Sequence, residues 1–139
     1  MMSKGTVLAV IVGSITYWVL EGLWMGLLMG DHYAAAYAPY RAVMADPMQA
    51  NPAIWFVGTT VVAAIITFIV RRGDVSVRSG AICGAVFVAG MTFVMEWGMS
   101  NMFINYPFVP TSLISVAWEA VSGGATGAAI GAVMARFGR

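Results

Sequence analysis

Three glutamates are the residues of this sequence whose type and position point most clearly to chemistry. Glu21, Glu96 and Glu119 each lie near the middle of a separate apolar stretch, and those stretches contain no lysine or arginine. An acidic side chain near the centre of a membrane helix costs about 2.5 to 3.5 kcal/mol, and such residues usually face a bundle interior or a water-filled cavity where ions or protons pass. We therefore predict an ion- or ligand-binding site built on these carboxylates.

One helical face extends this site in the last apolar stretch. Polar side chains recur there at three- and four-residue spacing, which places them on a single stripe that is too regular to face lipid. The stripe consists of Ser112, Ser115, Glu119, Ser122 and Thr126. In the first stretch, Tyr17 shares a face with Glu21. An alternative role for the hydroxyls is to join helices by hydrogen bonds, which contribute about 0.6 kcal/mol each in membranes.

Tryptophans lie close to every one of these glutamates in the sequence. Trp18 and Trp24 flank Glu21, Trp97 follows Glu96, and Trp118 precedes Glu119. A carboxylate beside an aromatic wall suits an organic or quaternary cation, through charge pairing and cation–π attraction. The alternative is that the indoles anchor the helices in lipid or fill space. The predicted ligand- or ion-binding site comprises Glu21, Glu96, Glu119, Tyr17, Ser115, Ser122 and Trp118.

The composition defines the class of protein that must hold this site. With 60% hydrophobic and 9% charged residues, a soluble core of this size would have almost no polar surface to solvate it. The sequence therefore predicts an integral membrane protein with lipids as its surroundings. A formal net charge of +1 provides no basic surface, so we expect no nucleic-acid partner.

Four stretches reach the length of about 20 apolar residues that a membrane helix needs. They cover residues 6–29, 53–70, 79–103 and 109–135. The first is too long for the apolar region of a secretory signal, and its glutamate and tryptophans are wrong for one, so we expect it to be retained. The predicted fold is an all-α four-helix membrane bundle in a single domain, residues 1–139.

The distribution of basic residues predicts the orientation of the bundle. They belong to the two termini or to the connection between the second and third helices, apart from Arg41 in the first connection. Because positive residues favour the cytoplasmic side, both termini should be cytoplasmic. At about 1.5 Å of rise per residue, the three glutamates then lie roughly 4 to 8 Å to the outer side of the midplane. Three helices would deliver a carboxylate to one level.

The long first outer connection, residues 30–52, contains aromatic residues at helical spacing. These residues are Tyr33, Tyr37 and Tyr40, and Met44 continues the series. The spacing predicts a short helix lying in the membrane interface. It would serve as an interfacial anchor or as a lid over the site.

Repeated glycines indicate where the helices can approach closely. Glycines recur every fourth residue in the first helix, at Gly22, Gly26 and Gly30, and in the fourth helix, at Gly123, Gly127 and Gly131. Such repeats allow close contact between helix backbones, within one chain or between subunits. We therefore expect a homo-oligomer or a larger membrane complex.

Methionines raise the question of a metal. Met91, Met95, Met99 and Met102 form a stripe on the third helix, and thioethers are soft ligands suited to Cu(I). The stripe is centred about 100° around the helix from Glu96, so we expect the thioethers and the carboxylate not to share an ion. Methionine also fills apolar cores. The sequence identifies neither a metal nor a cofactor.

Few catalytic arrangements are compatible with this composition. A single histidine, His32, excludes the paired ligands of a di-iron bundle or of a bis-histidine haem within one chain, and the single Cys83 excludes a cysteine-based zinc site. No phosphate-binding glycine loop or nucleophile elbow is present. We therefore expect that the protein is not an enzyme.

Several short motifs resemble those of a known family. They are Leu23-Trp24-Met25-Gly26 followed by Gly30, then Asn105-Tyr106, Ala120-Val121-Ser122 and the Gly/Ala-rich residues 127–132. Together they resemble a family of small four-helix bacterial inner-membrane proteins known chiefly as a domain of unknown function. The resemblance implies a multi-pass protein of the bacterial inner (cytoplasmic) membrane and implies no activity. The three glutamates are not part of that pattern.

Two functions of different kinds fit these features. In the first, the protein is a proton-linked or cation transporter or channel, and Glu21, Glu96 and Glu119 are its cation or proton sites. In the second, it is an accessory or assembly subunit whose polar stripes and glycine faces bind a larger membrane complex. A lipid, pigment or metal role is a third, less favoured interpretation.

Overall fold

The computed structural model describes residues 3–42 and 51–138, and every described element is helical. Met44 and Arg139 lie outside these ranges. The elements are α1 (Lys4–Leu23), the π-helical turn η1 (Trp24–Leu28), α2 (Gly30–Ala36), the short turn η2 (Ala38–Tyr40), α3 (Pro52–Arg72), α4 (Val77–Met102), the π-helical turn η4 (Phe108–Ser112) and α5 (Leu113–Phe137). The predicted all-α class is confirmed.

Four helices are long and apolar enough to cross a membrane. They are Lys4–Leu28, Pro52–Arg72, Val77–Met102 and Phe108–Phe137. Each lies within a few residues of a predicted stretch. The second begins at Pro52 and ends at the Arg71-Arg72 pair.

Polar side chains at the helix starts explain where these helices begin. Ser3 accepts a hydrogen bond from the Thr6 amide, Asn51 accepts one from Ala53, and Ser76 accepts one from Ser79. Each satisfies an amide that has no partner within its own helix.

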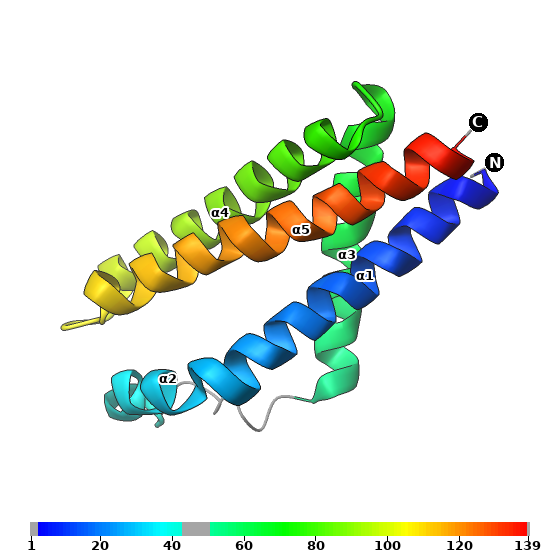
Figure 1. Ribbon diagram of the computed structural model, residues 1–139. Coiled ribbons are helices and arrows are strands. Elements are labelled where there is room, and N and C mark those ends of the chain that lie inside the picture. The colour runs from blue at the N-terminus through cyan, green and yellow to red at the C-terminus, as the bar shows by residue number, and fades with distance from the viewer. Residues whose placement is uncertain (1–2, 43–50, 139) are drawn as a thin grey trace.

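The helices are arranged around α5 (Figure 1). α4 and α5 run side by side as an antiparallel pair, α1 packs against α5 and α3, and α3 crosses them at a steep angle. Both termini lie at one end of the molecule, which we call the terminal end. α2 lies at the opposite end, which we call the α2 end.

Glycines permit the close approach of α4 and α5. A Cβ atom on Gly127 would overlap the carbonyl of Gly80, and one on Gly123 would lie 2.6 Å from the carbonyl oxygen of Gly84. The close contact predicted for the α5 glycines therefore occurs within the chain. Its partner is a second glycine pair on α4, which the sequence analysis did not single out.

The glycine repeat of α1 makes no such contact among the described residues. A Cβ on Gly22 or Gly26 would meet none of them within 4 Å, and the predicted contact between subunits stays a prediction. Close approach by α1 occurs instead at Gly5, beside the Phe137 carbonyl, and at Gly13, where a Cβ would lie 2.7 Å from the Ile130 side chain.

The apolar core occupies the terminal half of the molecule. Its fully or almost fully buried members are Ala9, Ala63, Ile66, Val70, Val88, Ile130 and Met134. These residues come from the halves of α1, α3, α4 and α5 that are nearest the terminal end. The helices diverge toward the α2 end, and the space between them there holds the site.

Candidate functional site

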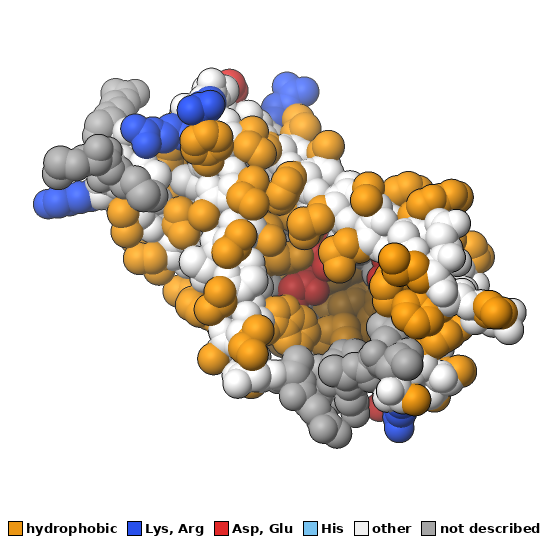
Figure 2. Space-filling model, turned by 180° about the vertical axis from the view of Figure 1, so that it is seen from behind, with side chains coloured by type: hydrophobic (Ala, Val, Ile, Leu, Met, Phe, Trp, Pro, Cys, Tyr) orange, Lys and Arg blue, Asp and Glu red, His pale blue; other side chains and the backbone are white. Residues whose placement is uncertain are grey.

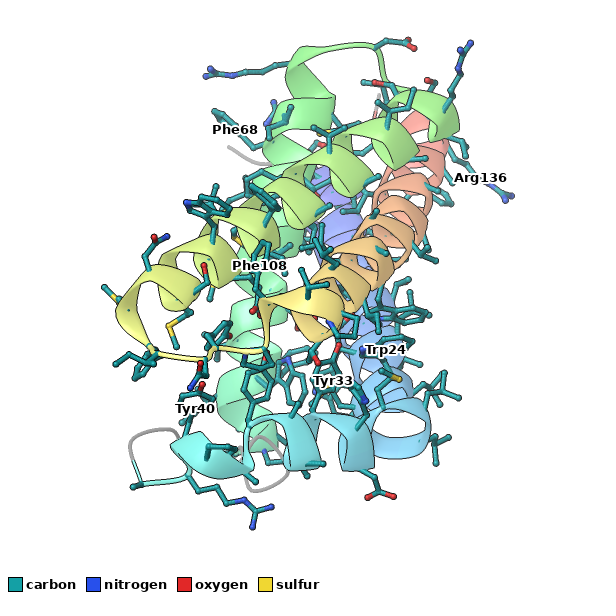
Figure 3. The ribbon with its side chains drawn as sticks, turned by 90° about the vertical axis from the view of Figure 1, so that its left-hand side faces the viewer. Trp24, Tyr33, Tyr40, Phe68, Phe108 and Arg136 are labelled. Carbon is teal, nitrogen blue, oxygen red and sulfur yellow. The ribbon has the colours of Figure 1, made fainter. Side chains whose placement is uncertain are left out.

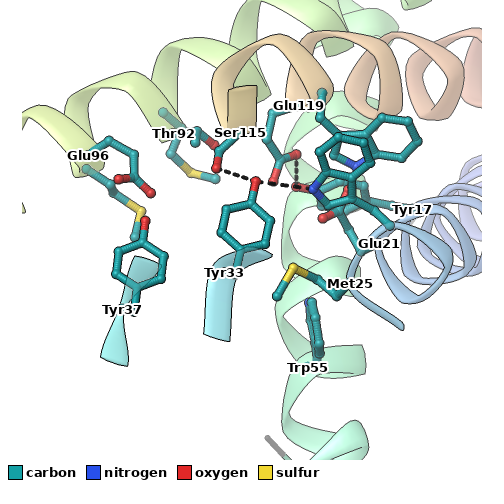
Figure 4. A pocket seen from close by; sticks show the side chains of 14 residues that line it. Tyr17, Glu21, Met25, Tyr33, Tyr37, Trp55, Thr92, Glu96, Ser115 and Glu119 are labelled. Atoms are coloured by element: carbon teal, nitrogen blue, oxygen red, sulfur yellow. Dashed lines mark hydrogen bonds between the residues drawn. The ribbon is translucent and has the colours of Figure 1, made fainter. Parts of the chain in front are cut away.

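A cavity of about 350 Å³ lies between the diverging helices. Glu21, Glu96 and Glu119 all line it. Among the described residues, no lysine or arginine contributes to its wall. Figure 4 shows Glu96 and Tyr37 at one side of the cavity, and Glu21, Glu119 and Tyr17 at the other. The volume falls within the range of about 300 to 1,000 Å³ that is usual for small-molecule sites.

Two of the carboxylates form a reciprocal arrangement between α1 and α5. The Tyr17 hydroxyl of α1 donates a hydrogen bond to Glu119 Oε2 of α5 at 2.7 Å. In the opposite direction, Trp118 Nε1 of α5 donates to Glu21 Oε1 of α1 at 2.8 Å. Ser122 donates a further bond to Glu119 Oε2 at 3.1 Å. We call these five residues the Glu119 cluster.

The third carboxylate belongs to a separate set of contacts. Glu96 Oε2 accepts hydrogen bonds from the Tyr106 hydroxyl, at 2.8 Å, and from the Ser112 hydroxyl. Tyr106 also lies 3.3 Å from the Tyr37 hydroxyl. We call these four residues the Glu96 cluster. Burial raises the pKa of the Tyr106 phenol, and its hydrogen bonds to Tyr37 and Glu96 raise it further. Burial likewise raises the pKa of Tyr37.

α2 closes the cavity at its own end through a chain of hydrogen bonds. The Tyr33 hydroxyl lies 2.6 Å from Ser115 Oγ, and Trp24 Nε1 donates to the Tyr33 hydroxyl at 3.3 Å. Ser115 in turn donates to the Thr111 carbonyl at 3.2 Å. Figure 3 shows Tyr33 and Trp24 beneath the first turns of α5. His32 strengthens the attachment, since its Nε2 lies 3.1 Å from Thr111 Oγ1.

The turn between α4 and η4 positions Tyr106. Asn105 has a φ of 61°, in the left-handed region that asparagine tolerates better than most residues. The chain reverses here, so Tyr106 points back to Glu96, which lies ten residues earlier on α4. The Tyr40 hydroxyl donates to the Ile104 carbonyl at 2.8 Å and attaches this turn to the end of the α2 segment.

Six of the seven predicted site residues line the cavity: Tyr17, Glu21, Glu96, Ser115, Trp118 and Glu119. Ser122 is fully buried behind the wall and contacts the cavity through Glu119. The sequence analysis gave no site role to Trp55 or Tyr106, and treated Tyr33 and Tyr37 as parts of an anchor or lid. A signal was present for Tyr106, because a phenol in a short connection ten residues after Glu96 is within reach of it.

The tryptophans do not all lie beside the glutamates that adjoin them in the sequence. Trp118 bonds to Glu21 rather than to the adjacent Glu119, and its ring stacks on Trp24 with centroids 4.4 Å apart. Trp18 and Trp97 lie outside the cavity wall, 41% and 56% exposed. Successive residues on a helix point about 100° apart, so a neighbour in sequence faces elsewhere. The prediction of an indole beside each carboxylate is wrong for Glu96.

Two methionines of the predicted stripe lie in the same cavity as Glu96, and whether they share an ion with it stays a prediction. Met91 and Met95 line the cavity together with Glu96, and Met25 approaches from η1. The cavity is wide enough to be bordered by side chains that point well apart on one helix. Among the described residues, no three histidine, cysteine, aspartate or glutamate side chains are grouped closely enough to hold a metal ion.

One buried hydroxyl on the α5 stripe has no partner. Thr126 is 0% exposed, and its Oγ1 makes no hydrogen bond to the described residues. Ser112, Ser115, Glu119 and Ser122 all bond to side chains of the two clusters or of α2. The stripe therefore serves mainly to connect α5 with α1, α2 and α4.

Four membrane-length helices around a carboxylate-lined cavity are features of a multi-pass membrane protein with a polar internal site. No protein-family model, curated protein sequence or solved structure matches this chain. The function proposed below therefore depends on the geometry of the cavity.

Proposed function

We propose that this protein is a small membrane transporter for cations, in which protons or cations occupy the carboxylates of one cavity. The observation that supports this most directly is that α1, α4 and α5 each contribute a glutamate to the cavity wall, to which no described lysine or arginine contributes. Uncompensated carboxylates inside a membrane protein are costly and are typical of ion and proton pathways.

The hydrogen bonds of the two clusters favour this role over a purely structural one. Tyrosine, serine and tryptophan donors hold the carboxylate oxygens in place but carry no positive charge. A structural acid would be expected to bond to a fixed cation, which would neutralise it. Here the negative charge is left for a mobile cation or proton, so we propose transport rather than catalysis.

The proposed orientation places the cavity nearer the outer side of a bacterial inner membrane. Lys4, Arg71, Arg72, Arg78 and Arg136 all belong to the terminal end, where the positive-inside rule favours the cytoplasm. The α2 end would then face outward. α2 would lie in the interface, with Tyr33 and Tyr37 directed at the cavity as a lid.

An accessory or assembly subunit is the second candidate function. The observation that favours it is the open face of α1, where Gly22 and Gly26 have no neighbour that a Cβ would meet. A helix of another subunit, or of a second copy of this chain, fits close against such a face. In this case the protein would be recovered from native membranes with a stable partner.

The two candidates are separated by measuring flux in reconstituted vesicles. Wild-type protein should move protons together with an alkali or organic cation or with Cu(I). Glu119→Gln, which keeps the shape and removes the charge, should reduce uptake to the level of empty vesicles and leave the fold intact. Asp74→Asn is the matched control, because Asp74 is an exposed acid in the turn between α3 and α4.

The outcome contradicts the transporter proposal if the wild-type protein moves none of these cations. Recovery of a fixed partner whose binding is weakened by Glu119→Gln would then support the accessory role. Equal loss of flux in Asp74→Asn and Glu119→Gln would show that the effect is one of general surface charge and not of the cavity.

A further inference from the structure

The cavity opens sideways, between α3 and α4. Figure 2 shows the hollow from this side, with acidic side chains at its bottom and hydrophobic side chains around it. Trp55 of α3 and Met91 and Met95 of α4 belong to the wall of the cavity, and the two methionines are 37% and 63% exposed. Because both helices are of membrane length, this opening faces the region that lipid chains occupy.

Aromatic rings form much of the wall inside the opening. Trp24 and Trp118 stack with an interplanar angle of 4°, and Tyr33 and Tyr37 stack with centroids 6.1 Å apart. Trp55 of α3 also lines the cavity, next to Met25 in Figure 4. Aromatic faces attract cations most strongly when water is excluded, and Trp is the most effective of the three rings.

The spacing of the acids fits a ligand larger than a single ion. Glu21 and Glu119 belong to one cluster and Glu96 to the other, and the described residues hold no group of three that would chelate a metal. The cavity of about 350 Å³ has room for about twelve water volumes of roughly 30 Å³ each. A cation that fills it without a hydration shell must have a substantial organic part.

We propose that the cavity takes a monovalent amphiphilic organic cation directly from the bilayer, through the opening between α3 and α4. The cationic group lies between the Glu119 and Glu96 clusters against the aromatic wall that includes Trp55, and the apolar tail lies along Met91 and Met95 into the membrane. Flexible thioethers adapt to tails of different shape, as they do at other promiscuous binding surfaces. This inference rests on the proposed function and specifies its substrate class and entry route.

Binding to protein in nanodiscs of zwitterionic phospholipid tests the inference. The probe is radiolabelled dodecyltrimethylammonium, and specific binding is the saturable part that exceeds uptake by empty nanodiscs. Two competitors each carry one part of the probe. Tetramethylammonium has the charged group without the alkyl tail, and dodecanol has the alkyl tail without the charge. We expect tetramethylammonium to compete at least about tenfold more weakly than the unlabelled probe, and dodecanol not to compete.

Variants then locate the binding. Glu119→Gln should abolish saturable binding, and Trp55→Ala should weaken it by roughly two- to thirtyfold, the range of a cation–π contact. Trp55→Phe, which retains an aromatic face, should recover most of the affinity. Trp97→Ala is the matched control, because Trp97 is an exposed tryptophan outside the cavity wall, and should bind as the wild type does.

Each remaining outcome decides between the inference and the proposed function. Equal potency of tetramethylammonium and the probe would mean entry from water and would overturn the lateral route. Proton or alkali-cation flux without saturable binding of the probe would overturn the substrate class and leave the transporter proposal standing. Absence of both flux and binding would remove both proposals.

Discussion

Each glutamate of the cavity accepts hydrogen bonds from neutral donors. Tyr17 and Ser122 hold Glu119, Trp118 holds Glu21, and two hydroxyls hold Glu96. Such donors fix the direction of the carboxylate without cancelling its charge. At the scale of the residue, the carboxylates are held in place by neutral groups, which supports the proposed cation site.

Tyr106 provides a prediction on pH at this scale. Burial raises its pKa above the ordinary value of 10.0, so the folded protein keeps the phenol neutral to a higher pH than the unfolded chain does. The resulting stabilisation is fully present below the ordinary value and declines as pH rises above it. In an alkaline titration followed by tyrosinate absorbance, tyrosines with raised pKa values ionise after the others. Tyr106→Phe should therefore reduce the absorbance change of this late phase.

The same titration contains its own control. Tyr40 is a tyrosine of the same end of the molecule whose hydroxyl donates to a backbone carbonyl instead of a carboxylate, so Tyr40→Phe should leave the contribution of Tyr106 in place. If Tyr106→Phe instead reduces the absorbance change near the ordinary tyrosine pKa of 10.0, Tyr106 is not held by Glu96 in this way.

At the scale of the element, α5 supplies both the packing and the polarity of the fold. Its glycines bring its backbone against α4, and its polar stripe bonds to α1, α2 and α4. A displacement of α5 would therefore disturb both carboxylate clusters at once. The close contact of Gly127 with Gly80 sets the position of α5, and with it Glu119, relative to Glu96 on α4.

Gly127→Ala tests this contact with a single added methyl group. Because that group would overlap the Gly80 carbonyl, the two helices must separate, and we expect a loss of about 1 to 3 kcal/mol in the free energy of unfolding in detergent. Gly90→Ala is the matched control on α4, since a Cβ there meets nothing within 4 Å. It should be neutral or stabilising by up to about 1 kcal/mol, because alanine favours a helix. Similar stability of both variants would disprove the close contact.

The sequence predicted elements well and tertiary partners only in part. The α5 stripe was recognisable because helical geometry alone determines which of its residues share a face. Gly22 and Gly26 have no close neighbour among the described residues, because a glycine repeat permits close approach without determining which helix approaches. Trp97 misled because adjacency in sequence does not mean adjacency in space on a helix. The roles of Trp55 and Tyr106 depend on how α3 crosses the bundle and how the chain turns after α4, which no local pattern encodes.

At the scale of the whole molecule, one half is packed and the other is hollow. The terminal half buries its apolar residues and glycines, whereas the α2 half surrounds a cavity that α2 covers and that opens between α3 and α4. In the proposed function, the packed half would hold the helices together and the hollow half would admit the ligand. The central claim is that a cation occupies the hollow half between the carboxylates.

Anomalous scattering from a bound cation tests that claim most directly. The arsonium analogue of dodecyltrimethylammonium carries a single heavy atom at its charged centre, so crystals grown with it would locate that charge. We predict an arsenic peak inside the cavity, between Glu96 and the pair Glu21 and Glu119, which is absent from crystals of Glu119→Gln. A cavity filled by lipid or by another polypeptide, with arsenic elsewhere or undetected at saturating concentration, would contradict the account.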